Sequence, residues 1–254
     1  MRDFTPKIYR ELLLELKKQE YTFQTFHDFL ISPAEKAVVI RHDVDSRKKN
    51  SLHFAHIENA FDISTSYYFR MVPKSFDPVI VDLIKDLGHE IGYHYEDLSL
   101  AHGDMEKGIQ LFEQHLNKMR QYYPVKTICM HGSPLSRYDN RDLWKNYNYR
   151  DYDIVGEPYF DIDFRKVFYL TDTGRSWDNR KISIRDYVHN GFNLHFRSTR
   201  EIIRSCSELP DVVMFNFHPQ RWDDRLMPWL RELVFQNMKN LVKKYFFVQR
   251  GISE

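Results

Sequence analysis

Carboxylates and histidines follow four strand-like runs of this 254-residue sequence. After the runs at 38–40, 90–93, 127–130 and 212–217, the chain continues with these candidates: Asp43 and Asp45, His94 and Glu96, His131, and His218. Such side chains bind divalent metals, and they are also the usual acids and bases of hydrolytic enzymes. If the four runs end at the same place in the fold, the sequence predicts a metal-binding or acid–base site there.

Asp43 and Asp45 are separated by a single residue. In an extended segment, residues i and i+2 face the same side, so both carboxylates would project together. Adjacent carboxylates repel each other unless a cation or a shared proton relieves them. As an alternative, Asp45 caps the helix that follows, but this leaves Asp43 unexplained. The three histidines also have structural alternatives, as buried core or turn residues.

Hydrophobic periodicity predicts the elements that position these residues. The strand-like runs lie at 37–40, 65–69, 90–93, 125–130, 153–155, 167–171 and 212–217. Helical spacing predicts a helix of about three turns from Pro6, and further helices over 47–61, 77–87, 104–123 and about 228–244. The last helix is expected to bury Leu230, Leu233, Val234, Met238 and Leu241.

This alternation of strands and amphipathic helices predicts an α/β fold with a parallel sheet. At least six strands in one domain favour a barrel, whose active site lies at the carboxyl ends of the strands. No glycine-rich fingerprint follows a strand, which argues against a nucleotide-binding fold. We therefore expect a single domain over 1–254, with residues 1–36 as an N-terminal helical extension packed on the barrel.

Composition excludes several classes of protein. Lys and Arg number 37 against 36 Asp and Glu, a formal charge of +1, so nucleic acid is not an expected partner. No apolar run approaches the roughly 20 residues of a membrane span, and no signal peptide is recognised, so we expect a cytoplasmic location. The two cysteines give no disulfide framework, and Cys129 is interpreted as a small buried hydrophobe.

Three motifs carry a resemblance to a known family. Gly88-His89-Glu90-Ile91-Gly92-Tyr93-His94 resembles a motif that runs into a metal-binding histidine. Arg41–Asp45 resembles a strand ending in paired aspartates, Phe215–His218 resembles a strand ending in a catalytic histidine, and 65–69 resembles a strand between the first two motifs. Over about 36–220 the chain thus resembles a divergent branch of the polysaccharide deacetylase superfamily, also called the NodB-homology family or carbohydrate esterase family 4 (CE4).

The resemblance implies a distorted (β/α)7-type TIM-like barrel with one divalent metal, held by one aspartate and two histidines. By position, Asp43 would be the catalytic base, Asp45 and His94 would be metal ligands, and His218 would be the general acid. The family's aspartates are adjacent, whereas Val44 separates them here, so the roles of Asp43 and Asp45 could exchange.

The family's second metal histidine has no counterpart, because position 98 is leucine. We prefer His131 as the third ligand, with Glu96 as the alternative. His131 could instead orient Asp43, as an arginine does in the family's third motif, and loss of the metal site is a further possibility. Zn²⁺ is the first choice of cofactor, and Mn²⁺ or Co²⁺ would also suit such ligands.

The implied activity is that of a metal-dependent carbohydrate deacetylase-like hydrolase acting on non-peptide C–N bonds. It would remove an acetyl group from an N-acetylated sugar in surface polysaccharide metabolism, whether a sugar nucleotide, a lipid-linked sugar or a polysaccharide. Tyr93, Trp177 and Trp222 are candidates for stacking on the sugar ring. The alternatives are a non-catalytic carbohydrate-binding or scaffold protein on the same barrel, and a cyclic-amide hydrolase.

Overall fold

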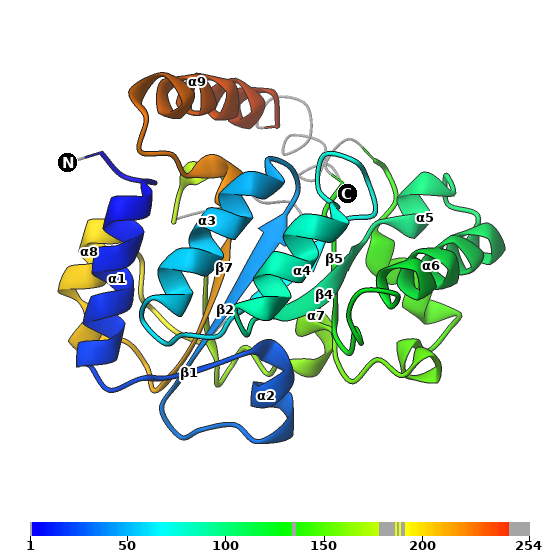
Figure 1. Cartoon of the computed structure of the whole chain (residues 1–254), viewed down its shortest axis with the longest axis horizontal. Helices are drawn as coiled ribbons and strands as arrows, with labels where there is room; N and C mark the ends of the chain where they lie inside the picture. Colours follow the sequence, from blue (N-terminus) through cyan, green and yellow to red (C-terminus); the bar gives the residue numbers. More distant parts are fainter. Residues whose placement is uncertain (1, 134–135, 178–185, 187, 189–190, 244–254) are drawn as a thin grey trace.

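One curled, parallel sheet organises the molecule (Figure 1). The computed structural model describes residues 2–133, 136–177, 186, 188 and 191–243. Within these residues the strands are β1 (Thr22–Gln24), β2 (Ala37–Val44), β3 (Ser66–Phe69), β4 (Glu90–Tyr95), β5 (Ile128–Met130), β6 (Phe168–Thr171) and β7 (Val212–Phe217). They lie in the order β5-β4-β3-β2-β7-β6, with β1 paired to β2 beside this path, and every pair is parallel. The predicted distorted barrel is confirmed as a half-barrel of parallel strands surrounded by helices.

Helices connect and cover the strands. The α-helices are α1 (Pro6–Lys18), α2 (Phe26–Ile31), α3 (Lys48–Asn59), α4 (Pro78–Asp86), α5 (Asp97–Leu100), α6 (Met105–Met119), α7 (Pro158–Asp161), α8 (Thr199–Arg204) and α9 (Leu226–Lys243). Short 3₁₀ turns are η1 (Asn140–Lys145), η2 (Tyr149–Tyr152), η3 (Thr173–Arg175), η4 (Cys206–Glu208) and η5 (Pro219–Arg221). In the described part of the chain, no helix combines the length and apolar character that crossing a membrane would require.

Local sequence explains why the longer helices begin where they do. The Thr5 side chain accepts a hydrogen bond from the Ile8 N–H, and Pro6 occupies the first turn of α1, where its missing donor costs nothing. Asp104 caps α6 in the same way through the Lys107 N–H. In both helices the apolar residues recur at helical spacing and are buried, in α1 as Ile8, Leu12, Leu13 and Leu16.

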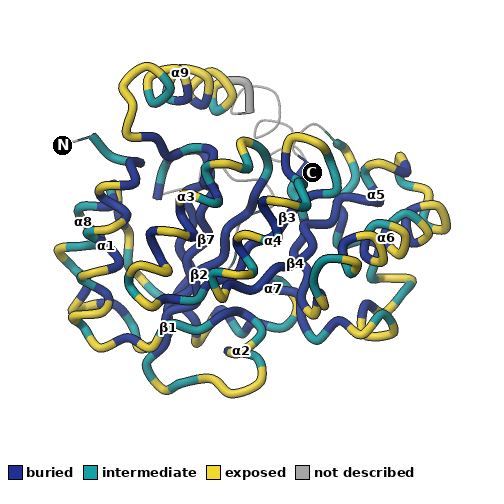
Figure 2. The backbone as a smooth tube through the Cα atoms, viewed as in Figure 1, coloured by how far each residue is buried: buried dark blue, intermediate teal, exposed yellow. Residues whose placement is uncertain are grey.

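β2 is the central strand and is buried along its whole length (Figure 2). One edge pairs with β7 from Ala37 to His42. The other edge is divided, because β1 pairs with Ala37–Val39 and β3 with Arg41–Val44. The strand therefore continues four residues beyond the predicted apolar run, and its polar second half is held in extended conformation at the centre of the sheet.

Two sequence predictions differ from the structure at the strand level. Residues 153–155 form no strand, and nearby there is only an isolated bridge between Thr127 and Gly156. Residues 1–36 are more than a helical extension, since β1 joins the sheet between α1 and α2. The three residues of β1 are too short to give a clear alternating pattern, which explains why the sequence does not reveal them.

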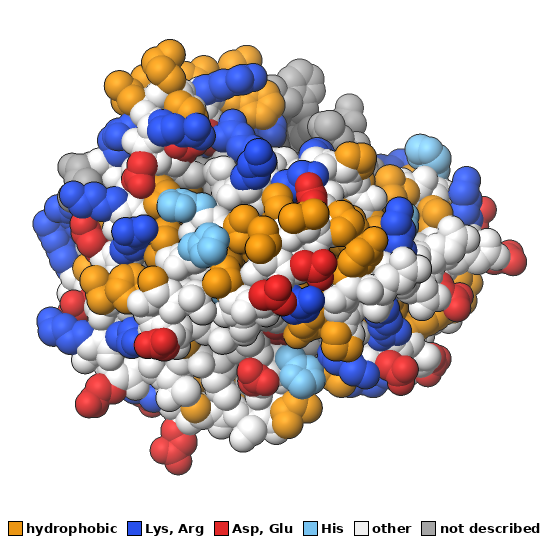
Figure 3. All heavy atoms as spheres, in the orientation of Figure 1, with side chains coloured by type: hydrophobic (Ala, Val, Ile, Leu, Met, Phe, Trp, Pro, Cys, Tyr) orange, Lys and Arg blue, Asp and Glu red, His pale blue; other side chains and the backbone are white. Residues whose placement is uncertain are grey.

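The last helix, α9, packs on the rest of the protein with the face opposite to the one predicted from the sequence. Leu230, Val234, Met238 and Leu241 are exposed, whereas Glu232 and Gln236 are buried. Polar contacts hold this orientation: Glu232 lies 3.2 Å from Arg47, and Asn240 donates to the Gly174 carbonyl. Periodicity identifies the apolar face of a helix but not the side on which the protein lies, and Figure 3 shows hydrophobic and basic side chains together on α9 at the top of the molecule.

A buried polar cluster surrounds Glu58 of α3. Its carboxylate accepts hydrogen bonds from Tyr9, from Tyr67 at 2.5 Å and from Thr65 at 2.9 Å, and His42 Nε2 lies 2.6 Å away. Burial alone would raise the pKa of Glu58, but His42 and the hydroxyl donors lower it to about 2. The cluster satisfies a charge in the core and ties α1 and α3 to β2 and β3.

Candidate functional site

The carboxyl end of β2 brings Asp45 to two histidines. Asp45 Oδ1 lies 3.5 Å from His94 Nε2 and 3.4 Å from His131 Nε2. Asp45 directly follows β2, His94 is in β4, and His131 directly follows β5. One ligand atom from each residue lies within 4.8 Å of the other two. The three side chains preferred as metal ligands from the sequence are therefore neighbours in space.

Backbone and carboxylate acceptors orient the two imidazoles. His94 Nδ1 lies 2.9 Å from the Cys129 carbonyl oxygen, and His131 Nδ1 lies 2.9 Å from Glu96 Oε2. Both acceptors call for a proton on Nδ1, which leaves the Nε2 lone pair free on the side facing Asp45. A hydrogen-bonded Nδ1 is the usual arrangement of a metal-binding histidine.

Glu96, the alternative third ligand, is occupied elsewhere. Its two oxygens accept hydrogen bonds from Arg70, at 2.8 Å from Nε and 2.7 Å from Nη2, and from His131. Burial would raise the pKa of Glu96, but His131 and Arg70 lower it to about 2. The structure thus brings His131, and not Glu96, to Asp45 and His94, and places Glu96 behind His131.

The donor set suits a divalent cation. Asp45 Oδ2 accepts a hydrogen bond from Gln220 at 3.0 Å, but Oδ1 is buried and accepts none. Burial would raise the pKa of Asp45, whereas His131, His94 and His218 hold it well below its usual value. An ionised carboxylate oxygen without a donor, facing two imidazole lone pairs, fits a zinc, manganese or cobalt ion.

A second cluster of potential ligands, formed by Asp43, His94 and Cys129, fits a metal less well. Burial raises the pKa of the Cys129 thiol well above its usual value, and metal binding requires the thiolate. The sulfur also accepts a hydrogen bond from Arg41 at 2.9 Å. Cys129 is buried and unpaired with Cys206, in agreement with its interpretation as a core residue.

Asp43 lies beside the metal-type cluster and is held by groups that sequence reasoning missed. Its Oδ2 accepts a hydrogen bond from Asn216 at 2.9 Å and lies 3.5 Å from Arg41 Nη2, while Oδ1 is buried without a hydrogen bond. The same Oδ2 is 4.0 Å from both His94 Nε2 and His218 Nε2. His131 does not orient Asp43; Arg41 and Asn216 do.

The spacing of Arg41 and Asn216 could have identified them. Each lies two residues before a predicted site residue, Arg41 before Asp43 within β2 and Asn216 before His218, which directly follows β7, and so faces the same side in extended backbone. The register of β2 and β7 then places Arg41 opposite Asn216. The hydroxyl oxygens of Tyr159 and Tyr169 each accept a hydrogen bond of 3.0 Å from Arg41 Nη2. These two hydrogen bonds fix the position of the guanidinium.

His218 is paired with Asp172, a residue that is not among the candidates predicted from the sequence. His218 Nδ1 lies 2.6 Å from Asp172 Oδ1, and the fully buried carboxylate also accepts from Arg221 at 2.9 Å and Trp222 at 2.5 Å. Burial would raise the pKa of Asp172, but His218 and Arg221 lower it. Asp172 directly follows β6, so the rule that located the other candidates at strand ends applies to it as well.

The three aromatic residues predicted to stack on a sugar are core residues. Tyr93, Trp177 and Trp222 are 1%, 4% and 1% exposed. Tyr93 donates to Asp97, Trp177 donates to Thr199, and Trp222 donates to Asp172. The stacking prediction is therefore wrong for this structure, because these rings pack inside the molecule, although Trp222 supports the site through Asp172.

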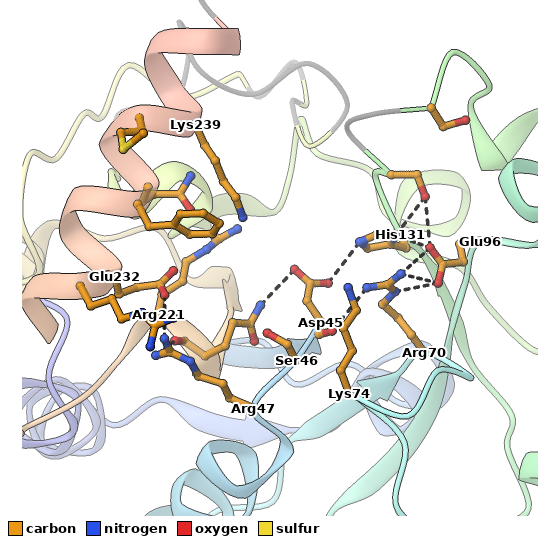
Figure 4. A pocket seen from close by; sticks show the side chains of 17 residues that line it. Asp45, Ser46, Arg47, Arg70, Lys74, Glu96, His131, Arg221, Glu232 and Lys239 are labelled. Atoms are coloured by element: carbon orange, nitrogen blue, oxygen red, sulfur yellow. Dashed lines mark hydrogen bonds and ion pairs between the residues drawn. The ribbon is translucent and has the colours of Figure 1, made fainter. Parts of the chain in front are cut away.

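A cavity of about 770 Å³ opens beside Asp45. Figure 4 shows Asp45 between two walls, with His131, Glu96 and Arg70 on one side and Glu232 and Lys239 of α9 on the other. Asp43, His94 and His218 are almost completely buried and are not part of the cavity lining, whereas Asp45, His131 and Glu96 are. A ligand in the cavity would meet the cluster from the side of α9.

Comparisons with known proteins give structural neighbours only. No family model and no curated protein matches the sequence. Wild-type BA3943, a CE4 family pseudoenzyme from Bacillus anthracis, is 13% identical with a TM-score of 0.41 and covers 83% of this chain, which in turn spans only 62% of that protein. A BA3943 mutant with restored enzymatic activity gives the same identity and TM-score, at 84% and 65% coverage.

A family 4 carbohydrate esterase from Streptomyces lividans in complex with acetate is also similar, at 13% identity and a TM-score of 0.41, over 82% of this chain and 90% of the esterase. Sequence identity and structural similarity at this level do not identify the activity of this chain. The solved structures to which the chain is similar are CE4 family esterases and pseudoenzymes, and the assignment of a function rests on its own side chains.

Proposed function

We propose that this protein is a metal-dependent hydrolase that removes the acetyl group from an N-acetylated sugar. The observation that carries the proposal is the arrangement around Asp43 Oδ2. Two imidazole nitrogens lie 4.0 Å from it: Nε2 of His94, which belongs to the three-residue ligand cluster, and Nε2 of His218, which is paired with Asp172. Amide hydrolysis is accelerated by a base that takes a proton from the attacking water and an acid that protonates the leaving nitrogen, and Asp43 and His218 are suited to these two roles.

A divalent ion held by Asp45, His94 and His131 would act as a Lewis acid and lower the pKa of its water. Asp43 is assigned as the base that takes a proton from the attacking water. Asn216 and Arg41 hold its carboxylate in position. His218 is assigned as the acid that protonates the departing sugar amine, with Asp172 fixing the proton on Nδ1 and stabilising the charged ring.

The separation of Asp43 from Asp45 supports this division of roles. Asp45 Oδ1 faces both imidazole nitrogens at 3.4–3.5 Å, whereas Asp43 Oδ2 is farther from His94 and is already hydrogen-bonded to Asn216. The intervening Val44 is completely buried, and in an extended strand its side chain points to the opposite face. Asp45 is therefore the better ligand and Asp43 the better base.

Acetate release tests the proposal. The full chain, purified without chelator, is loaded with Zn²⁺, Mn²⁺ or Co²⁺ and incubated with a panel of N-acetylated sugars. We expect about one ion per chain, acetate release that stops on chelation, and little bound metal in Asp45→Ala or His94→Ala.

The Asp43→Asn variant separates base from ligand. It should keep the metal and lose about 10²–10⁴-fold in rate. The control is Asp86→Asn, an exposed residue at the end of α4, which should behave as the parent. A parent that takes up no added metal would favour the non-catalytic alternative and overturn the proposal.

A further inference from the structure

The cavity beside Asp45 is lined by an excess of basic side chains. Six lining residues are basic and three are acidic, and the basic ones are Arg47, Arg70, Lys74, Arg221, Arg231 and Lys239. The whole chain carries a formal charge of only +1, so this excess belongs to the cavity and not to a generally basic protein. A local concentration of one charge in a concave site attracts ligands of the opposite charge.

The acidic residues of the lining are already engaged. Glu96 is bound by Arg70 and His131, and Glu232 lies 3.2 Å from Arg47. Asp45 belongs to the ligand cluster. Among the basic residues, Arg221 is bound to Asp172 at 2.9 Å. In the described ranges, Lys74, Arg231 and Lys239 have no carboxylate within ion-pair distance.

Arg221 and Lys74 lie close enough to Lys239 to influence it. Partial burial lowers the pKa of Lys239, Glu232 opposes this, and Arg221 and Lys74 lower it further. Figure 4 shows Lys239 reaching down from α9 and Lys74 reaching up from the opposite wall, with Asp45 between them. Mutual repulsion among these cations makes an anion in the cavity favourable.

Resting on the function proposed above, we propose that the N-acetylated substrate carries a phosphate group, which binds between Lys74, Arg231 and Lys239 while the acetamido group lies at Asp45. Lys and Arg are the residues that bind phosphate most effectively, through charge-assisted hydrogen bonds. A neutral sugar polymer would leave the three cations unpaired. The phosphate belongs either to a nucleoside diphosphate sugar or to a lipid-linked sugar phosphate, and both sources share this chemistry.

Binding without turnover tests the proposal directly. In the Asp43→Asn background, calorimetry compares N-acetylglucosamine 1-phosphate with the neutral methyl glycoside of the same sugar. We expect the phosphorylated sugar to bind at least about tenfold more tightly, and more weakly as salt is added. The same sugar on uridine diphosphate and on a short prenyl phosphate then distinguishes the two sources, since the true source binds more tightly than the simple 1-phosphate.

Charge variants identify the residues. Lys74→Met, Arg231→Met and Lys239→Met should each weaken binding of the phosphorylated sugar several-fold, and Lys74→Met with Lys239→Met should reduce it to the level of the neutral glycoside. Lys118→Met, an exposed residue of α6 outside the cavity lining, is the control and should have no effect. Equal binding of the two sugars, or a double variant that binds as the parent does, overturns the phosphate subsite.

Failure of the subsite and failure of the hydrolase proposal give different results. Acetate release from neutral and phosphorylated sugars with equal kcat/KM would retain the hydrolase and reject the phosphate subsite. Tight, lysine-dependent binding of the phosphorylated sugar without acetate release from any metal-loaded sample would retain the subsite and reject the hydrolase.

Discussion

His218 Nδ1 lies 2.6 Å from Asp172 Oδ1, in a pair that is buried from solvent. Because Asp172 accepts the Nδ1 proton, it leaves Nε2 as the atom that faces Asp43 and the reacting centre. Asp172→Asn should lower kcat by about 10²-fold or more, since the amide no longer stabilises a charged imidazole. Bound metal should be unchanged, because Asp172 contacts none of the three ligands.

A matched variant tests whether the lower kcat of Asp172→Asn arises from the lost interaction with His218. Trp222→Phe removes one donor to Asp172 but keeps a buried ring, so its kcat should fall much less than that of Asp172→Asn. Steady-state kinetics and metal analysis on the same samples provide the comparison. If Asp172→Asn loses metal together with activity, Asp172 acts through the general structure of the site instead.

Glu96 should tune metal affinity without binding the metal. Its hydrogen bond to His131 Nδ1 fixes the ring, so Glu96→Gln should weaken metal binding by about 10–100-fold. Titration against a chelating dye measures the affinity, with the exposed α6 variant Glu106→Gln as control. If His131→Ala retained metal while Glu96→Gln lost it completely, Glu96 would be the third ligand.

Asn216 should affect the rate through Asp43. Its side-chain amide is the 2.9 Å donor to Asp43 Oδ2, and a hydrogen bond to a charged group contributes about 1.5–3 kcal/mol. Asn216→Ala should therefore lower kcat by about tenfold to a hundredfold with normal metal content. Asn117→Ala, exposed on α6, serves as the control, and an unchanged kcat in Asn216→Ala would show that Arg41 alone aligns Asp43.

Glu58 should make the fold sensitive to acid. Its pKa is lowered from 4.5 to about 2 in the folded protein, so its contribution to stability is complete above about pH 4.5 and is lost as the pH falls toward 2. Glu58→Gln should cost about 3–5 kcal/mol at neutral pH, because it leaves His42 buried without its partner.

The pH dependence distinguishes this contribution from simple packing. Urea unfolding between pH 2 and 7 should show a shallower loss of stability in Glu58→Gln than in the parent over pH 4.5 to 2. Glu113→Gln, exposed on α6, should follow the parent at every pH. If the free energy of unfolding changed with pH in the same way in the parent and in Glu58→Gln, Glu58 would have the same pKa in the folded and the unfolded protein.

Much of the site could be predicted because polar residues at strand ends break an apolar pattern. Asp43, Asp45, His94, His131 and His218 all follow buried runs, and a parallel sheet gathers such positions at one edge. Asp172 obeys the same rule, but it follows a weaker run in a region of mixed Tyr, Asp and Arg, where no single residue stands out.

Other features depend on tertiary context that no local pattern contains. From the sequence, Trp177 and Trp222 could equally stack on a ligand or pack in the hydrophobic core. Their burial in the folded protein shows that they pack in the core. For α9, the apolar face is evident in the sequence, but the contacts of Glu232 with Arg47 and of Asn240 with Gly174 determine which face turns inward. These partners are distant in sequence, so periodicity alone cannot supply them.

The divided edge of β2 has a consequence for synthesis on the ribosome. β1 and β3 are close to β2 in sequence and can pair with one of its edges early in translation. β7 pairs with the other edge and is synthesised much later: Asn216 of β7 lies 173 residues after its hydrogen-bond partner Asp43 of β2. Until then the nascent chain exposes unpaired backbone groups along a strand rich in Val and Ile, a surface prone to aggregation. Chains that terminate before residue 212 should therefore depend on chaperones to stay dispersed.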